Sequence, residues 1–292
     1  MKKSFFEPSR GFKVFNVILF TVFGFVTFYP FWYVFVGSII PFTELSSKVI
    51  LLYPENITFE AYKQIFSSSS IPNALKINVI VTVGGTILNL LFTTLAAYVF
   101  TKKELPARNF WFSLAIFTML FNSGLIPMYV TLSNYGLIDS LWVYILPTLI
   151  NTYYMIIMKT SFEQLPKELE ESAKIDGCNE IGILFRIIIP ISLPIMATIG
   201  LFYAVDRWNE LFTAIFFIND ENKVTLQAVL YRMLQSTDPT MSEPTIGEGG
   251  AAMLPEQLKY ASIIVATLPI LAVYPFLQRF FVKGVLIGSV KG

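Results

Sequence analysis

The sequence contains no histidine and only one cysteine, Cys178, among its 292 residues. Without histidine, the chain lacks the side chain that most often binds metals and that most often acts as a general base near neutral pH. A single cysteine excludes an internal disulfide and a cysteine-based metal cluster. We therefore expect no catalytic residue, no metal site and no cofactor bound by this chain.

Charge is also scarce, because Asp, Glu, Lys and Arg make up 14% of the residues and the net charge is +1. This balance gives no indication of a nucleic-acid partner. The sequence has no Gly-x-x-x-x-Gly-Lys-Ser/Thr stretch, and its last glycines, Gly284, Gly288 and Gly292, lack the lysine-hydroxyl pair of a phosphate-binding loop. We conclude that this chain does not hydrolyse ATP by itself.

Apolar residues are abundant: they make up 54% of the chain, and the mean hydropathy is +0.62. Uncharged runs of 18 or more residues are long enough to cross the hydrocarbon core of a membrane as helices. Six such runs occur, at Val14–Thr43, Ile77–Thr101, Asn109–Ile138, Ser140–Met158, Ile187–Val205 and Tyr260–Gln278. They predict an all-α, multi-pass protein of the cell membrane with six transmembrane helices in the lipid bilayer.

Turn residues separate the third of these runs from the fourth, and a glycine pair lies in the second. We expect a helix near residues 110–130, a short loop, and then a helix capped by Asp139 and Ser140. Gly84 and Gly85, in the second run, favour a close contact with another helix.

Basic residues decide the orientation, because lysine and arginine are enriched in short cytoplasmic loops. Thr101–Arg108 carries three basic residues, whereas Phe121–Ser140 carries none. We therefore predict that both termini and the connection 159–186 are cytoplasmic, and that the connection 219–259 is outside. The resulting organisation is a first part, residues 1–76, with one span and an outer loop, and a transmembrane core, residues 77–292.

The connection before the fifth run contains the stretch EESAKIDGCNE, residues 170–180, which is charged but patterned as helix. Leu165, Leu169, Ser172 and Ala173 share one face at helical spacing. Gly177 suits the left-handed residue at the end of a helix, and Asn179 can cap the next one. A second apolar stripe follows, and its members are Ile181, Leu184, Phe185 and Ile188. The pattern alone fits either a solvated loop or a helix–Gly–helix elbow that docks on another protein.

The stretch Asp206-Arg-Trp-Asn-Glu210 places charges at the end of the fifth run. Ionisable residues inside membrane segments are candidates for function. One reading is a solvated helix end in which Asp206 or Glu210 pairs with Arg207. The other is that Asp206, Trp208, Asn209 and Glu210 line the outer part of a translocation path.

Three motifs in order carry a resemblance to a known family. Glu171-Ser-Ala-Lys-Ile-Asp-Gly177 followed by Phe185-Arg-Ile-Ile-Ile-Pro190 resembles the EAA loop of permease subunits of ATP-binding-cassette importers. Trp208-Asn209 and the terminal Phe281-Val-Lys-Gly…Gly-Ser-Val-Lys-Gly292 resemble the sugar-importer branch related to the maltose permeases, and within it permeases for polysaccharide-derived oligosaccharides. Ser172 departs from the pattern, which usually has alanine there.

The resemblance implies a type I importer permease fold that works by alternating access. It implies that a cytoplasmic ATPase dimer, which binds ATP and Mg, docks on the coupling helices at 166–186. The implied coupling residues are Glu171, Ser172, Ala173, Asp176, Gly177, Phe185 and Pro190. It also implies a second, different permease subunit and an extracellular sugar-binding protein, whose cleft the loop Gln235–Gln257 would enter. The tail from Gly284 would reach the ATPase.

Two rival functions remain open at this point. An ion-coupled secondary transporter of a small solute would need acids or polar breaks near the middle of the membrane, and the runs have essentially no central charge. A membrane-embedded enzyme or scaffold would need reactive side chains that the sequence does not offer.

Overall fold

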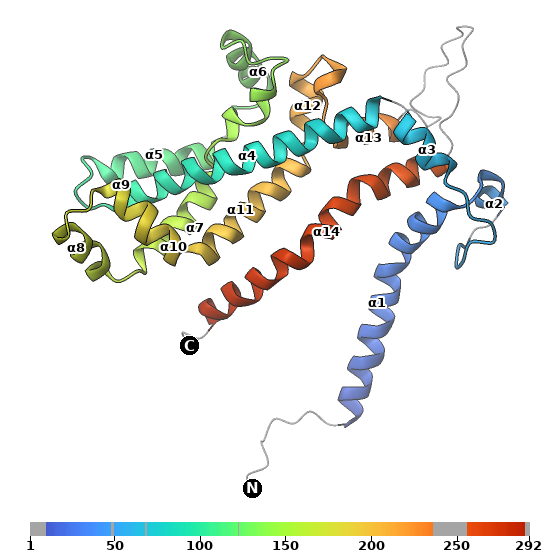
Figure 1. Ribbon diagram of the computed structural model, residues 1–292, viewed down its shortest axis with the longest axis horizontal. Helices are drawn as coiled ribbons and strands as arrows, with labels where there is room; N and C mark the ends of the chain where they lie inside the picture. Colours follow the sequence, from blue (N-terminus) through green and yellow to red (C-terminus); the bar gives the residue numbers. More distant parts are fainter. Residues whose placement is uncertain (1–9, 48–49, 68, 122, 236–255, 290–292) are drawn as a thin grey trace. The chain divides into compact units, whose positions relative to one another are not determined.

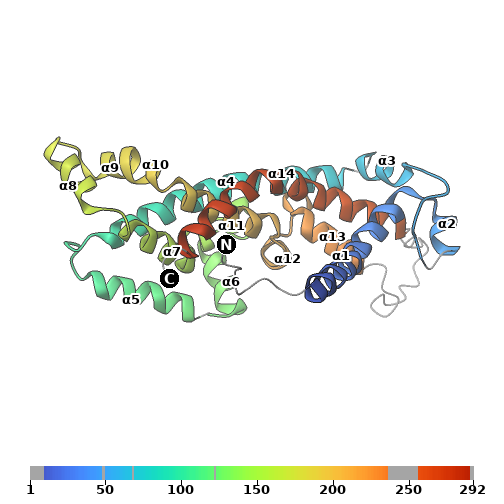
Figure 2. The ribbon, with the colours of Figure 1, turned by 90° about the horizontal axis from the view of Figure 1, so that it is seen from below.

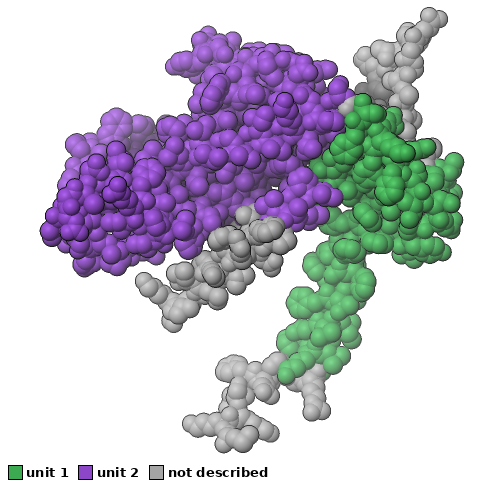
Figure 3. All heavy atoms as spheres, viewed as in Figure 1, with its two compact units in different colours: residues 1–68, 233–267 green, residues 69–232, 268–292 purple. Residues whose placement is uncertain are grey.

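The computed structural model describes residues 10–47, 50–67, 69–121, 123–235 and 256–289, and within these ranges it contains helices and no strands (Figure 1). The chain divides into two compact units (Figure 3). The first comprises residues 1–68 with 233–267, and the second comprises residues 69–232 with 268–292. The predicted division at residue 76 stays a prediction.

The first unit is built around α1 (Arg10–Ile39), α2 (Phe42–Ser47), α3 (Glu60–Ser67) and the first turns of α14 (Glu256–Ser289). The 30 residues of α1 span about 45 Å at 1.5 Å per residue, enough to cross a membrane. Most of α1 exposes its apolar side chains, but its last turns bury Val36 and Ile40 against Leu45 and Leu51. The exposed stretch is therefore suited to lipid, and the buried end anchors the helix.

Polar contacts fold the segment between α1 and α3 onto the first unit. The buried Glu44 carboxylate accepts hydrogen bonds from the backbone N–H groups of Glu55 and Asn56, at 2.9 and 3.1 Å. Trp32 Nε1 donates to the carbonyl of Leu52 at 2.9 Å. The connection after the first span is thus an ordered cap made of short helices.

The second unit is organised along α4 (Ser70–Thr101), against which α7 (Thr152–Glu163) and α11 (Leu193–Trp208) pack. Both views place α8 (Lys167–Ile175), α9 (Glu180–Ile183) and α10 (Ile189–Ile191) toward one end of α4 (Figures 1 and 2). They place α12 (Phe212–Phe217) and α13 (Leu226–Gln235) toward the other end. Each end has its own buried apolar core.

Three helices are long and apolar enough to cross a membrane unbroken, and three bent pairs bring the number to six if each pair crosses once. The bent pairs explain why one expectation was wrong. Instead of one helix near 110–130, α5 (Arg108–Leu120) and α6 (Leu125–Asn134) meet at 118°. Gly124, whose φ is +80°, stands at this break, because glycine tolerates that backbone conformation.

The next span also begins differently from expectation. Ser140 caps a short 3₁₀ turn (η1, Leu141–Tyr144), a second turn follows (η2, Leu146–Thr148), and Asn151 caps α7. Asp139 does not cap a helix: its carboxylate accepts hydrogen bonds from the backbone N–H groups of Asn219 and Asp220. The α-helix therefore starts later than the Asp139-Ser140 pair predicted.

The third pair bends by 87° between α10 and α11. It includes a π-helical segment, η3 (Leu184–Ile188), and the bend falls at Ser192 between Pro190 and Pro194. Proline interrupts the helical hydrogen-bond ladder, which accounts for a sharp bend here.

Polar side chains on α4 hold the irregular segment before α7. Asn89 is fully buried, and its Nδ2 donates to the carbonyls of Thr148 and Leu149 at 2.6 and 3.0 Å. The hydroxyl of Tyr203 on α11 lies 2.6 Å from that of Thr93 and accepts from the backbone N–H of Asn151 at 2.9 Å. These bonds satisfy backbone groups that a helix would otherwise satisfy internally, as non-helical backbone at membrane depth requires.

Candidate functional site

The first candidate site is the elbow, residues 166–190, which contains α8, Gly177, α9 and η3. α8 ends in a Schellman motif, in which the N–H of Cys178 donates to the carbonyl of Ala173 and that of Gly177 to Lys174. Gly177 has φ +79°, and the side chain of Asn179 accepts from the N–H of Gly182 to cap α9. Both local predictions, the left-handed Gly177 and the Asn179 cap, are confirmed.

The elbow does not offer its small residues as one docking face. Ala173 is 5% exposed and belongs to the same core as Tyr98 and Ile183, whereas Ser172 and Glu171 are exposed. The expected shared face of Ser172 and Ala173 is therefore wrong, because Ala173 packs against this chain's own helices. Asp176 is also exposed.

Large apolar side chains project from the elbow instead. Ile175 is 87% exposed and Ile181 is 67% exposed, one on each side of the Gly177 turn. The predicted second stripe is only half correct: Leu184 and Ile188 are buried, but Ile181 and Phe185 face outward. The π-helical turn at 184–188 changes the register after Leu184, which a spacing of 3.6 residues does not anticipate. Pro190 is exposed at the start of the bend.

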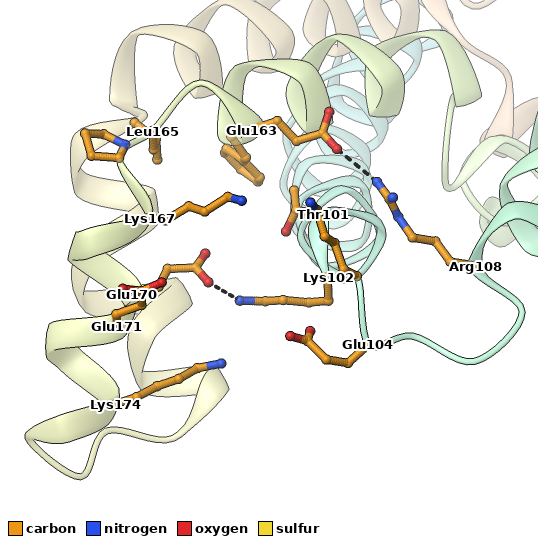
Figure 4. A pocket seen from close by; sticks show the side chains of 13 residues that line it. Thr101, Lys102, Glu104, Arg108, Glu163, Leu165, Lys167, Glu170, Glu171 and Lys174 are labelled. Carbon is orange, nitrogen blue, oxygen red and sulfur yellow. Dashed lines mark hydrogen bonds and ion pairs between the residues drawn. The ribbon is translucent and has the colours of Figure 1, made fainter.

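Ion pairs fasten the elbow to the end of α4. Lys102 Nζ contacts Glu170 and lies 3.0 Å from Glu180 Oε2, and Tyr98 donates to Glu180 at 2.8 Å (Figure 4 shows the Lys102–Glu170 pair). Lys174 Nζ lies 2.8 Å from Glu180 Oε1. One carboxylate at the start of α9 thus joins α4, α8 and α9.

The electrostatics of this network favour the charged forms. Hydrogen bonding to Lys174, followed by that to Lys102 and Tyr98, lowers the pKa of Glu180 to about 2 against the effect of burial. Burial opposes the charge of Lys102, but its hydrogen bonds to Glu170, Tyr98 and Glu180 outweigh that effect and raise its pKa. The network therefore remains ionised at neutral pH.

A cavity of about 450 Å³ opens between the end of α4 and the elbow. Lys102 and Lys174 line it together with Glu104 and Glu171, and Arg108 pairs with Glu163 at its edge, at 2.9 Å (Figure 4). Side chains of both charges line this cavity, so it is a polar contact region between helices and not a site of one charge.

The second candidate site is at the end of α11. Arg207 is 5% exposed, and its guanidinium contacts the carbonyl of Tyr144, the hydroxyl of Thr148 at 2.6 Å and Glu210 Oε2 at 3.1 Å. Gly85 makes room for it, because a Cβ there would lie 3.0 Å from Arg207 Cδ. The close contact predicted for the glycine pair is therefore confirmed at Gly85.

The four residues that were predicted to line a translocation path differ in their exposure. Asp206 and Asn209 are exposed, and Asp206 accepts a hydrogen bond from Tyr154 at 2.9 Å. Trp208 is 7% exposed, so its ring is packed and is not available for stacking on a sugar within this chain. Glu210, and not Asp206, pairs with Arg207. The predicted pairing of Glu210 with Arg207 is therefore confirmed, but Arg207 is buried and Glu210 is only partly exposed, so the helix end is not solvated as expected.

The predicted outer loop and tail fall largely outside this description. Residues 236–255 and 290–292 lie outside the described residues, so the roles assigned to Gln235–Gln257 and to the terminal segment stay predictions.

The fold thus defines an all-helical membrane protein in which an ordered, charged elbow joins two apolar segments. The chain belongs to the family described as binding-protein-dependent transport system inner membrane component, whose profile matches residues 4–287. It is therefore a transport permease subunit of the cell membrane.

Individual relatives are similar over nearly the whole chain. The chain is 45% identical to Protein LplC of Bacillus subtilis (strain 168), over 98% of this chain and 97% of that protein. It is 42% identical to the polygalacturonan/rhamnogalacturonan transport system permease protein YtcP of the same strain, over 96% and 99% of the two chains. Among solved structures, it resembles a chain of a bacterial ABC transporter involved in the import of the acidic polysaccharide alginate. That match has a TM-score of 0.87 and 29% identity, and covers 96% of this chain and 100% of the other.

Proposed function

We propose that this chain is one permease half of an ATP-driven importer of oligosaccharides derived from polysaccharides. In this proposal both termini and the elbow are cytoplasmic, and a separate ATPase dimer, which holds ATP and Mg, docks on the elbow. A second, different permease completes the pathway, and an extracellular binding protein delivers the sugar. The names of the relatives support the substrate class, since YtcP is named for polygalacturonan and rhamnogalacturonan and the structural neighbour belongs to a transporter involved in the import of alginate.

The observation that carries the proposal is an elbow that is exposed on one side and fastened to the spans on the other. Ile175 and Ile181 present apolar side chains on either side of Gly177. Exposed apolar groups of this size, next to the exposed acid Glu171, suit insertion into a groove of a partner protein.

The fastened side explains how movement would pass into the membrane. Ala173, in the core, and the pairs of Lys102 with Glu170 and Glu180 tie the elbow to α4. A partner that pulls the elbow therefore moves α4 as well. Rigid-body movement of packed helices is a common form of alternating access.

Transport by the purified complex tests this proposal against ion coupling. The complex is isolated through a tag on this chain and reconstituted in proteoliposomes with its binding protein and labelled oligosaccharides. We expect uptake that needs internal ATP and the binding protein, and that does not respond to a proton or sodium gradient. Gradient-driven uptake by this chain alone would instead identify an ion-coupled transporter.

Variants of the elbow separate docking from folding. Ile175→Glu and Ile181→Glu place charges on the surface offered to the ATPase, and we expect each to reduce co-purification of the ATPase at least tenfold. The matched control is Ile50→Glu, because Ile50 is 64% exposed but belongs to the first unit and not to the elbow. Equal recovery of the ATPase with all three variants would count against docking on the elbow.

A further inference from the structure

The first unit contains a second pocket that the transport mechanism above does not use. It has a volume of about 270 Å³ and lies between α2, α3 and the start of α14. Pro41, Ala61 and Leu258 give it an apolar wall, and Glu60, Gln64 and Gln257 supply polar groups. All of these residues belong to one compact unit.

Gln257 is the residue that suggests a ligand. The residue is 8% exposed, and its Nε2 is buried with no hydrogen-bond partner among the described residues. A buried amide N–H left without a partner is costly, so native proteins rarely keep one unless something binds to it. Because Gln257 lines the pocket, an occupant with an oxygen acceptor would satisfy this donor.

The other lining groups define the chemistry of the occupant. Glu60 accepts hydrogen bonds, and Gln64 both donates and accepts them. Hydroxyl groups, which also do both, complement this set, and the apolar wall suits the C–H face of a ring. Within the described residues, no Lys or Arg lines the pocket, so a carboxylate on the ligand would meet Glu60 without a counter-charge.

We infer that this pocket is a subsite for one neutral pyranose ring of the transported saccharide. Its volume falls below the range of about 300–1,000 Å³ typical of pockets for drug-sized ligands, which matches a single ring and not a chain. The inference rests on the proposed function: in the predicted orientation, the pocket lies on the outer side of the membrane, where sugar arrives. It adds a preference for neutral sugar rings, although the structural neighbour takes part in the import of the acidic polysaccharide alginate.

Saturation-transfer NMR tests this subsite on the importer complex in nanodiscs without its binding protein. The probes are methyl β-D-galactopyranoside, which is neutral, and methyl β-D-galacturonoside, which is acidic. We expect saturable binding of the neutral probe and weaker binding of the acidic one. Gln257→Met, of similar length but without polar atoms, should weaken the neutral probe about fivefold, as expected for the loss of one neutral hydrogen bond.

Two further variants make the result specific. Glu60→Gln should reduce the preference for the neutral probe, because it removes the negative charge from the wall. Lys63→Met, on the same helix but outside the pocket, should leave binding unchanged. Gln257→Met should change the melting temperature little, since the Nε2 that it removes has no partner among the residues that the structure describes.

The outcomes distinguish this inference from the proposed function. Equal binding by the wild type and Gln257→Met, or preferred binding of the acidic probe, would overturn the subsite even if ATP-driven oligosaccharide uptake is intact. If Gln257→Met left binding of the neutral probe unchanged but, in a separate assay, weakened the association of the complex with its binding protein, the pocket would receive a peptide and the inference would be wrong. Absence of ATP-driven uptake in the wild type would instead defeat the proposed function.

Discussion

Replacing Lys102 with methionine should uncouple ATP hydrolysis from transport without unfolding the protein. Lys102 contacts both Glu170 and Glu180, and its side chain is 18% exposed, whereas theirs are 28% and 50% exposed. Pairs this exposed contribute roughly 0.2–1 kcal/mol each after screening by solvent, so the two together contribute about 1.5 kcal/mol. Methionine keeps the length of the side chain and removes only its charge and donors.

A loss of about 1.4 kcal/mol changes an equilibrium about tenfold, so the elbow should detach from α4 about ten times more often in Lys102→Met. The ATPase would still dock, because Ile175 and Ile181 are unchanged. We therefore expect near-normal ATP hydrolysis in proteoliposomes but several-fold fewer oligosaccharides transported per ATP.

The neighbouring lysine supplies a matched control. Lys103 is exposed and has no ion pair within the described residues, so Lys103→Met should transport normally. If Lys102→Met transported as many sugars per ATP as the wild type, force would not pass through this network.

Three other predictions follow from single groups. Gly177→Ala should destabilise the elbow by about 1–2 kcal/mol, measured by hydrogen exchange, because a side chain at φ +79° is strained even though no atom lies within 4 Å of the added Cβ. Gly11→Ala should not be destabilising, because Gly11 is helical and its surroundings are equally open. Arg207→Met should lower stability by about 3 kcal/mol in thermal unfolding, since it removes the cation beside Glu210 and the donors to Tyr144 and Thr148 at a largely buried site. The exposed Arg186→Met should change stability little. The pKa of Glu180 is lowered to about 2, so its contribution to the stability of the elbow is complete above about pH 4.5 and disappears as the pH falls toward 2. Hydrogen exchange of the elbow, corrected for intrinsic rates, should therefore be constant from pH 8 to 5 and increase below pH 5. The variant Glu180→Gln should not show this increase.

Local chemistry made part of the elbow predictable from sequence. The left-handed Gly177 and the Asn179 cap depend on residues within one turn, and the structure has both. The six crossings depend on runs of apolar residues, which length alone identifies.

Contacts between distant segments could not be predicted in the same way. Lys102 and Glu180 are 78 positions apart, and no periodicity links them. Ala173 and Ser172 differ in burial because a core that includes distant helices covers only one side of α8. Ile175 belongs to no apolar pattern, because it is a single apolar residue among charged ones. The break between α5 and α6 falls at Gly124, whose positive φ is not reported by hydropathy.

The central claim is that a separate ATPase holds the exposed side of the elbow, and cysteine cross-linking tests it most directly. Cys178 is the only cysteine, so Cys178→Ser gives a background without thiols in which Ile175→Cys or Ile181→Cys can be introduced. In the purified complex, cysteines at 175 and 181 should cross-link to the ATPase subunit, with a yield that changes when ATP binds. A cysteine at the buried Ala173 should not cross-link. If neither position 175 nor position 181 cross-linked to another subunit, or if all three positions gave equal yields, the account would be contradicted.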